Sequence, residues 1–265
     1  MHIGTPICLS PLAALPLLRR LSIVMEPGTE LTDAQVAELR ALPRLETLHV
    51  SATSTSLLRR LLARPHDLQW QQISLPQPLR QNDAALLPQL PSLTALSWTA
   101  HAQHLDSLDF LQRLPNLVSI HCFHCDGLVA QLTAALQHCT NVTELALDCC
   151  DDITAAHLAD LLPRLPRLQS LLLFDLTVDS LSFLAQAPLT SQLSRLVLSF
   201  CTKLPVAELR HVHSLLGLRE MDIFGSFDEP MDPDCAALAA LRPPSAALPL
   251  LESFTYTPPR IMSVQ

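Results

Sequence analysis

Glycine is scarce in this sequence, and that scarcity excludes folds that depend on an unusually free backbone. Only 5 of the 265 residues are glycine, which disfavours glycine-rich phosphate loops and folds with many tight hairpins. Aromatic residues are also few, at 4%. By contrast, 22 residues are proline and 49% are hydrophobic. The chain can therefore bury a substantial core, and we expect the prolines to serve a regular purpose in its fold.

Basic residues are too few and too dispersed to form a surface for nucleic acid. The chain has 17 Lys and Arg against 25 Asp and Glu, which gives a formal net charge of −8. Proteins that bind a phosphate backbone concentrate their Lys and Arg to displace counterions, whereas here these residues occur singly or in pairs. We therefore expect no nucleic acid partner.

Long hydrophobic runs are absent too. The apolar stretch from Ile7 to Leu18 is interrupted by Pro11 and Pro16 and is followed, rather than preceded, by Arg19 and Arg20, which is the reverse of a secretory signal. No uninterrupted apolar run reaches the roughly 18 to 20 residues of a membrane helix. Eight cysteines without such a signal favour reduced thiols. We expect a soluble chain in the cytoplasm or nucleus, without a membrane partner.

One motif recurs along the whole chain, with the form apolar-x-x-apolar-x-apolar and usually an introductory Leu-Pro. Examples are LPRLETLHV at Leu42, LPSLTALSW at Leu90 and LPRLQSLLL at Leu165. The eight intervals between Leu18 and Leu218 average 25 residues. A period of about 20 to 29 residues with this spacing is typical of leucine-rich repeats. The first apolar positions of the ten units are Leu18, Leu45, Trp70, Leu93, Leu117, Val142, Leu168, Leu193, Leu218 and Leu251.

Each unit combines a strand pattern with a helical pattern. Its last two apolar positions are two residues apart, which puts both side chains on one face of a short strand, and segments with helical spacing follow. Thr32 and Thr154 are cap-forming residues near two helix starts, and the Leu-Pro pair ends the preceding helix because proline cannot continue it. The helical segments include LTDAQVAELRAL from Leu31, GLVAQLTAAL from Gly127, ITAAHLADLL from Ile153 and PVAELRHVHSLL from Pro205.

Stacking of these units predicts the fold class. No single unit buries its apolar face alone, so neighbours must stack. We predict an α/β leucine-rich-repeat solenoid, or horseshoe, of about ten strand-helix units, with parallel strands on the concave face and helices on the convex face. Residues 1–265 are expected to form one domain: a cap or helix in 1–17, repeats in 18–250, and a final strand and tail in 251–265. The segment FDEPMDPD is expected to be a surface loop; if it reaches over the concave face, it competes with a partner.

The ninth position of each unit suggests a subclass. Its side chain normally bonds backbone groups of adjacent turns, and here it falls on Cys125, Cys150 and Cys201. The unit CTNVTELALDCCDDITAAHLADLL from Cys139 resembles the cysteine-containing leucine-rich repeats of F-box substrate receptors of ubiquitin ligases and of related mitotic-exit antagonists. The resemblance implies substrate recognition for a ligase. Because the first unit begins by Leu15, we expect that role to need an upstream F-box or a separate adaptor.

The motif HCFHC, from His121 to Cys125, is the strongest candidate for a metal or redox site. Four soft ligands in a tetrahedral array would hold zinc, and a reactive Cys-x-x-Cys would need an exposed thiol. In the repeat frame, however, Cys122 points inward and Cys125 and Cys150 are ninth-position residues, so we expect these side chains to be committed to packing and not to converge. We predict no cofactor, no metal and no enzymatic activity; a zinc- or thiol-dependent enzyme around Cys122 and Cys125 is the alternative.

The predicted binding surface is the concave face, where strand positions three, five and seven point away from the core. An exposed apolar cluster rimmed by charge is a frequent mark of a protein interface, and its carboxylates favour a partner with Lys or Arg. We therefore predict a scaffold that binds a protein or peptide. Two alternatives stay open: the phenylalanines pack sideways, or the convex face binds. The predicted residues are His121, Phe123, Glu144, Asp148, Leu172, Phe174, Asp175, Arg195, Val197, Glu220, Asp222 and Phe224.

Overall fold

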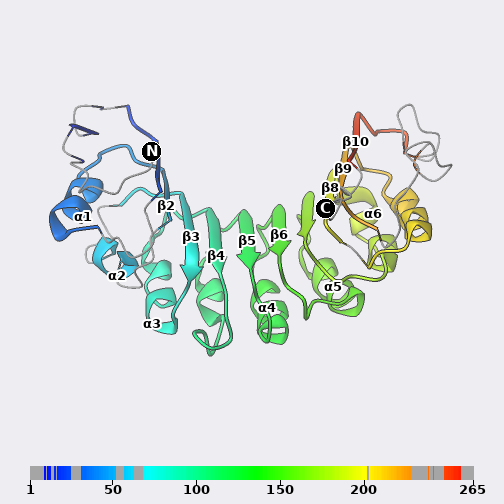
Figure 1. Ribbon diagram of the computed structural model, residues 1–265, viewed down its shortest axis with the longest axis horizontal. Coiled ribbons are helices and arrows are strands. Elements are labelled where there is room, and N and C mark those ends of the chain that lie inside the picture. Colours follow the sequence, from blue (N-terminus) through cyan, green and yellow to red (C-terminus); the bar gives the residue numbers. More distant parts are fainter. Residues whose placement is uncertain are drawn as a thin grey trace, which may run out of the picture.

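The computed structural model describes residues 9, 11–12, 15, 17–24, 31–51, 57–62, 68–201, 203–227, 238, 241 and 248–257. Within them, ten strands form one sheet in chain order from β1 to β10. Figure 1 shows an arch whose inner side is lined by these strands and whose outer side carries the helices. The strands are β1 Arg20–Val24, β2 Thr47–Ser51, β3 Gln72–Pro78, β4 Ala95–Thr99, β5 Ser119–Phe123, β6 Glu144–Asp148, β7 Ser170–Phe174, β8 Arg195–Ser199, β9 Glu220–Phe224 and β10 Ser253–Thr257.

The register of the sheet follows the repeat frame. Every strand begins two residues after the first apolar position of its unit, as β6 does after Val142. All neighbouring strands pair in parallel, so that Glu144 lies beside Ser170 and Ser170 beside Arg195. The predicted α/β solenoid of ten units, with parallel strands on the concave face, is therefore confirmed.

Two predicted helix starts are confirmed as capping boxes. The hydroxyl of Thr32 accepts a hydrogen bond from the amide of Gln35, and that of Thr154 accepts one from the amide of His157, both at 3.3 Å. Each side chain satisfies an amide that the first helical turn leaves free. The α-helices are α1 Asp33–Arg40, α2 Leu57–Leu61, α3 Gln81–Ala84, α4 Val129–Leu136, α5 Ala155–Leu161 and α6 Leu189–Gln192.

Further convex segments of the described residues are 3₁₀ helices, including η7, where an α-helical spacing was expected. Val206, Leu209, Val212 and Leu215 pack into or against the core, and they are three residues apart. That spacing matches the three residues per turn of a 3₁₀ helix. Leu90, Leu114 and Leu165 of the Leu-Pro pairs are the C-caps of η3, η4 and η5. The 3₁₀ helices are η3 Leu87–Gln89, η4 Asp109–Arg113, η5 Leu162–Arg164, η6 Ser182–Ala185 and η7 Val206–Ser214.

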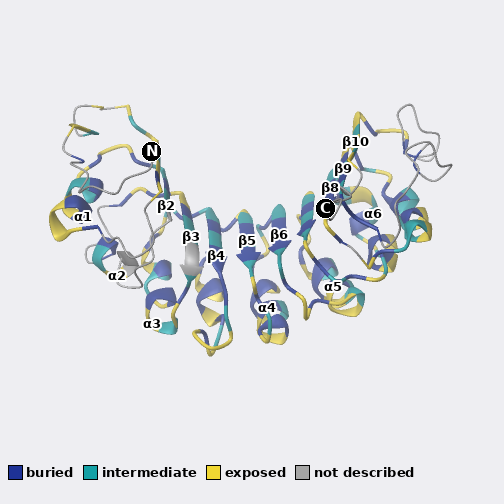
Figure 2. Ribbon diagram, in the orientation of Figure 1, coloured by how far each residue is buried: buried dark blue, intermediate teal, exposed yellow. Residues whose placement is uncertain are grey.

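One continuous core runs along the arch between the sheet and the convex layer. Figure 2 shows buried residues along the strands and on the helix faces turned toward them. In β6 and β7 the inward residues Leu145, Leu147, Leu171 and Leu173 are fully buried. This alternation of buried and outward residues leaves the other set of strand side chains on the concave face.

The structure describes the two ends of the chain only in part. Most of the expected cap in residues 1–17 lies outside the described residues, as do FDEPMDPD beyond Phe227 and residues 258–265. The strand β10 pairs in parallel with β9 and extends the sheet. No helix in the described ranges combines the length and hydropathy needed to cross a membrane.

Glu208 connects two consecutive units on the convex side. Its carboxylate accepts hydrogen bonds from the Ser180 hydroxyl at 2.7 Å and the Leu181 amide at 3.0 Å, and its side chain is only 12% exposed. Burial opposes ionisation, but these hydrogen bonds, with the charges of His211 and Arg210, hold the pKa of Glu208 below its usual value.

We expect Glu208→Ala to lower the free energy of unfolding by about 1 to 3 kcal/mol, because it leaves the half-buried Ser180 hydroxyl and the amide of the buried Leu181 without their acceptor. Because the pKa of this carboxyl is lower in the folded state than in the unfolded state, the ionised group stabilises the fold at pH values above its unfolded pKa. This stabilisation is lost as the pH falls through the folded-state pKa. The difference from wild type should therefore shrink below about pH 4.5. Urea titrations at several pH values measure it. Glu252→Ala, which removes an exposed carboxylate bound to Arg219, is the control; equal losses would contradict the assignment.

Candidate partner-binding site

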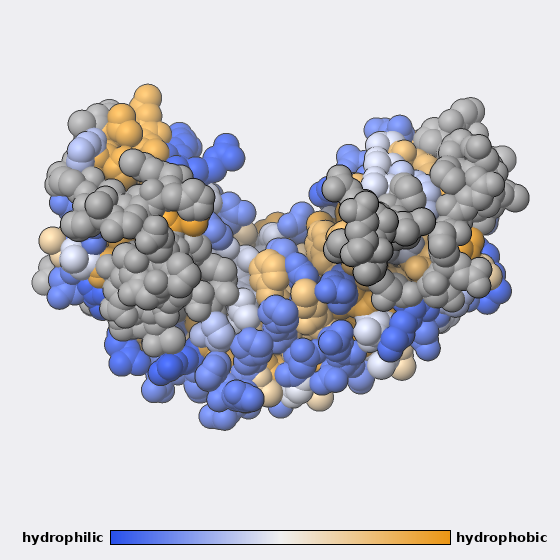
Figure 3. Space-filling view, in the orientation of Figure 1, coloured by the Kyte–Doolittle hydropathy of each residue, from blue (hydrophilic) through white to orange (hydrophobic). Residues whose placement is uncertain are grey.

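The concave face brings the predicted site residues together on five adjacent strands. Eleven of the twelve lie in β5 to β9, and Asp175 follows β7 directly. In β5 and β7 half-buried and buried residues alternate strictly. Figure 3 shows hydrophobic side chains in the hollow of the arch with hydrophilic ones around them. Whether a partner binds there stays a prediction.

An aromatic group crosses the middle of this face. The ring of His121 stacks on Phe123 with centroids 4.0 Å apart, and on Phe174 with centroids 6.1 Å apart. Phe123 and Phe174 flank Asp148 in the register of β5, β6 and β7. Both phenylalanines are half-buried. The expected outward direction and the alternative of sideways packing therefore both apply, because each ring packs against a neighbouring ring and remains partly exposed to solvent.

Several charges of the face are already paired within the molecule. Arg195 lies 3.3 Å from a carboxylate oxygen of Glu220 and 3.9 Å from one of Asp222. His121 lies 3.7 Å from a carboxylate oxygen of Asp148. Burial lowers the pKa of His121 against the pull of the nearby carboxylates, so the imidazole is neutral at pH 7. The acidic rim thus consists of Glu144, Asp148 and Asp175, with Glu220 and Asp222 paired to Arg195 beside them.

Two hollows open on the concave side and meet at Glu144. The first, about 260 Å³, extends over β2 to β6 and has His121 and Glu144 at one end. The second, about 290 Å³, lies over β6 to β9 and contains Arg195, Arg219 and Glu220. The polar side chains in the rest of the first hollow are Thr47, Gln72, Ser74, Ser97 and Ser119.

Comparisons with known proteins identify the architecture. No family model and no curated protein matches the sequence. Rad7, solved in a yeast complex with Elc1, is 16% identical with a TM-score of 0.52, over 78% of this chain and 57% of that one. The fold is a leucine-rich-repeat solenoid.

Two internalins from Listeria monocytogenes are also similar. The functional domain of InlJ, which includes a cysteine ladder, is 18% identical with a TM-score of 0.48, over 91% of this chain and 47% of that one. Internalin C2 is 15% identical with a TM-score of 0.38, over 86% and 84%. This chain therefore spans about half the length of InlJ and Rad7. The cysteine-containing subclass stays a prediction.

Val197 is buried, although the strand pattern predicts an accessible side chain; its role as a contact residue stays a prediction. It lies on the concave side at position five of β8 but is only 4% exposed. Its register partners are Leu172 on one side and Asp222 on the other. A short branched side chain between longer neighbours is recessed, so alternation gives its face but not its exposure.

Phe200 is the aromatic residue that the strand pattern misses. It follows β8 at position eight, is 56% exposed, and has a left-handed backbone with φ of 56°. Its ring carbons would lie 2.8 Å from a Cβ at Gly225, so glycine makes room for the ring. The same position carries the predicted Asp175, with φ of 48°. That shared position is the signal that could have found Phe200.

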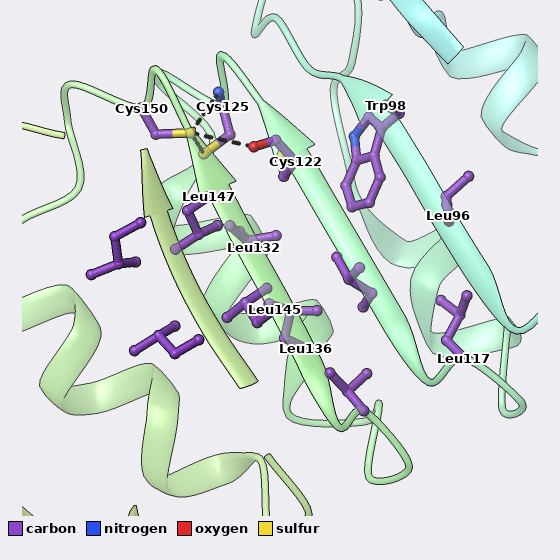
Figure 4. Packing of buried hydrophobic residues seen from close by; sticks show 14 of the residues in the cluster. Leu96, Trp98, Leu117, Cys122, Cys125, Leu132, Leu136, Leu145, Leu147 and Cys150 are labelled. Atoms are coloured by element: carbon purple, nitrogen blue, oxygen red, sulfur yellow. Dashed lines mark hydrogen bonds between the residues drawn. The ribbon is translucent and has the colours of Figure 1, made fainter. Parts of the chain in front are cut away.

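The expectation that Cys122, Cys125 and Cys150 would not converge is wrong. The sulfur atoms of Cys125 and Cys150 are 2.9 Å apart, and the Cys125 amide donates to the Cys150 sulfur at 3.4 Å. Figure 4 shows the three thiols together in the core, close to Leu147 and Leu132. Cys125 and Cys150 meet the inward Cys122 because each of the two repeat units has a left-handed residue directly after its strand, His124 or Cys149. This turn directs the side chain of the ninth position back into the core.

The histidines of the HCFHC motif do not join these thiols. His121 lies on the concave face against Phe123, and His124 is exposed just after β5. In the ranges that the structure describes, no set of three or more His, Cys, Asp or Glu side chains is arranged to hold a metal ion. The expected role of the ninth position is confirmed at Cys150, whose sulfur accepts the Cys125 amide, and at Ser226, whose hydroxyl accepts the Cys201 amide at 3.1 Å.

Proposed function

We propose that the protein is an interaction scaffold that binds a partner protein or peptide through its concave aromatic patch. We define this patch as Phe123, Phe174, Phe224 and His121, with Asp175 at its edge. The observation that carries the proposal is the His121 stack, which holds two half-exposed phenylalanine rings beside carboxylates. Aromatic side chains held rigidly and partly desolvated supply much of the energy of protein interfaces.

The chemistry of the patch defines the partner. Apolar side chains would cover the rings, and a basic side chain would meet the carboxylates, which favours fast and oriented association. The net charge of −8 supports a protein partner over a nucleic acid. Binding of this kind needs no cofactor. A cytoplasmic or nuclear location, without a membrane partner, belongs to the same proposal.

A scaffold is favoured over a thiol-dependent enzyme because the best nucleophiles are inaccessible. Cys122 and Cys125 are both 0% exposed, and burial raises the pKa of Cys122 well above its usual value. A catalytic thiol needs the opposite combination of access and a lowered pKa.

Substrate recognition for a ubiquitin ligase is a narrower form of the proposal. It is favoured by the Cys125–Cys150 ladder, which resembles the cysteine-containing repeats of F-box receptors. The fold of Rad7, which was solved in complex with Elc1, supports the use of such a solenoid in protein assemblies. Recovery of ligase subunits together with the partner would favour this form.

We expect Phe174→Asp and Phe224→Asp to reduce recovery of specific partners by more than about tenfold, because each change puts a charge into a desolvated contact. The measurement is quantitative affinity capture from the native cell. Leu216→Asp makes the same kind of change at a side chain that is 58% exposed between η7 and β9, away from the patch. If both phenylalanine variants stay folded and recover the same partners as the control, the patch is not the binding site.

A further inference from the structure

The first concave hollow differs chemically from the aromatic patch. We call it the hydroxyl groove and define it by Thr47, Ser74, Ser97 and Ser119 with Gln72, closed at one end by His121 and Glu144. Its short side chains leave a volume of about 260 Å³. Each hydroxyl carries two acceptor lone pairs, and Gln72 offers a carbonyl oxygen as well.

Among the described residues that line this groove, Glu144 is the one acidic or basic side chain apart from His121. Its Oε1 accepts a hydrogen bond from the Ser119 hydroxyl at 2.7 Å, which fixes the carboxylate, and no donor of the described residues is hydrogen-bonded to its Oε2. No basic side chain of the described residues lies within ion-pair distance of Glu144. The groove therefore presents a positioned negative charge surrounded by neutral acceptors.

The second hollow shows that this character is particular to the groove. There Arg195 is paired with Glu220 and Asp222, and Arg219 is paired with Glu252. A cation entering that hollow would meet two guanidinium groups as well as Glu144 and Glu220. A cation entering the hydroxyl groove would meet Glu144 and no guanidinium group among the lining residues. Charge complementarity thus favours one hollow over the other.

We infer that the hydroxyl groove receives a lysine side chain of the partner, with its ammonium group at Glu144. An ammonium is a point charge with three donors, which suits a carboxylate oxygen together with the hydroxyls that line the groove. An arginine favours a bidentate pair with both carboxylate oxygens, and the Ser119 hydroxyl already occupies one of the two lone pairs of Oε1.

This inference rests on the proposed function and specifies its partner. His121 lines the groove and also stacks on Phe123, so the groove adjoins the aromatic patch. A segment bound on the concave face would place a lysine in the groove while its neighbouring apolar residues cover the rings of Phe123 and Phe174.

The test is selection of random phage-displayed peptides on the immobilised full chain, with counter-selection on the Phe174→Asp/Phe224→Asp double variant. We expect the surviving peptides to share a lysine at one position beside apolar residues. For a synthesised peptide, replacing this lysine by norleucine should weaken binding to wild type about five- to tenfold. On Glu144→Gln the lysine and norleucine peptides should bind equally. Glu220→Gln, the same change at position three of β9, should keep the preference for lysine.

Four outcomes separate this inference from the proposed function. Peptides that depend on the aromatic patch but show no lysine preference would overturn the lysine site and leave the scaffold proposal intact. So would a preference that survives Glu144→Gln. Arginine binding as well as lysine at that position would overturn the choice of an ammonium group. A selection without any peptide that depends on Phe174 and Phe224 would count against the proposed function itself.

Discussion

Replacing Leu171 by alanine is expected to lower the free energy of unfolding by about 2 to 5 kcal/mol, whereas Leu172→Ala should cost about 1 kcal/mol or less. The two residues are neighbours in β7, but Leu171 is fully buried in the core, while Leu172 is half-buried on the concave face. Removing Leu171 leaves a cavity between sheet and convex layer, and removing Leu172 widens a surface already in contact with water. Urea unfolding followed by circular dichroism measures both values.

The same titration shows whether the array still unfolds as one unit. Each repeat contacts mainly its neighbours, so a damaged central unit can uncouple the two halves of a solenoid. A lower urea dependence in Leu171→Ala would report such uncoupling. Leu173→Ala, at the next inward position of β7, should behave like Leu171→Ala. Equal losses at Leu171 and Leu172 would show that the strand does not have the register described above.

The strands were predictable because their signal is periodic and repeated. Each marked apolar position fixes an inward side chain, and stacking then dictates parallel neighbours and the register. The convex layer was harder to predict. The segment from Pro205 was expected to be an α-helix, but its apolar residues Val206, Leu209 and Val212 are three apart, and it forms the 3₁₀ helix η7.

The sequence predicts on which side of the sheet the candidate site residues lie, but it does not predict how far each side chain is exposed. Alternation places Leu172 and Val197 on the concave side, yet only Leu172 is accessible, because exposure depends on the lengths of neighbouring side chains on other strands. Phe200 lies after its strand and owes its direction to a left-handed backbone, which the strand pattern does not describe. Side-chain exposure of this kind depends on contacts between neighbouring units, whose residues are about 25 positions apart in the sequence.

The thiols illustrate the same limit. Cys125 and Cys150 are 25 positions apart, and the frame correctly assigns both to ninth positions. Their contact at 2.9 Å follows from the parallel register of β5 and β6, which brings the ninth residues of consecutive units side by side. Hydrogen bonds from Cys122 and Cys125 lower the pKa of Cys150, whereas burial raises the pKa of Cys122.

In the native protein, the buried thiols should be alkylated much more slowly than the half-exposed thiol of Cys149. In a Cys8→Ser/Cys235→Ser background, the six remaining cysteines are all described. At pH 8, iodoacetamide should modify Cys122, Cys125, Cys139, Cys150 and Cys201 at least about 10³-fold more slowly than in denaturant, because the reagent reaches them only when the structure opens. Burial also raises the pKa of Cys139 and of Cys201 to about 11. Cys150 is included because burial protects it whatever its ionisation.

Cys149 is the internal control, since it is half-exposed and follows β6 at position eight. Desolvation and the neighbouring carboxylates of Asp148 and Asp175 raise its pKa to about 12. A raised pKa keeps the thiol protonated at neutral pH, so its alkylation rate should still climb between pH 9 and 10, where an ordinary thiol with a pKa near 8.5 levels off. Asp175→Asn should speed the reaction at pH 8. Trypsin leaves five of these cysteines in one peptide, residues 114–164, so tandem mass spectrometry of its fragments is needed to locate each modification. Rapid labelling of Cys125 or Cys150 in the folded protein would show that the three thiols are not enclosed as the buried cluster requires.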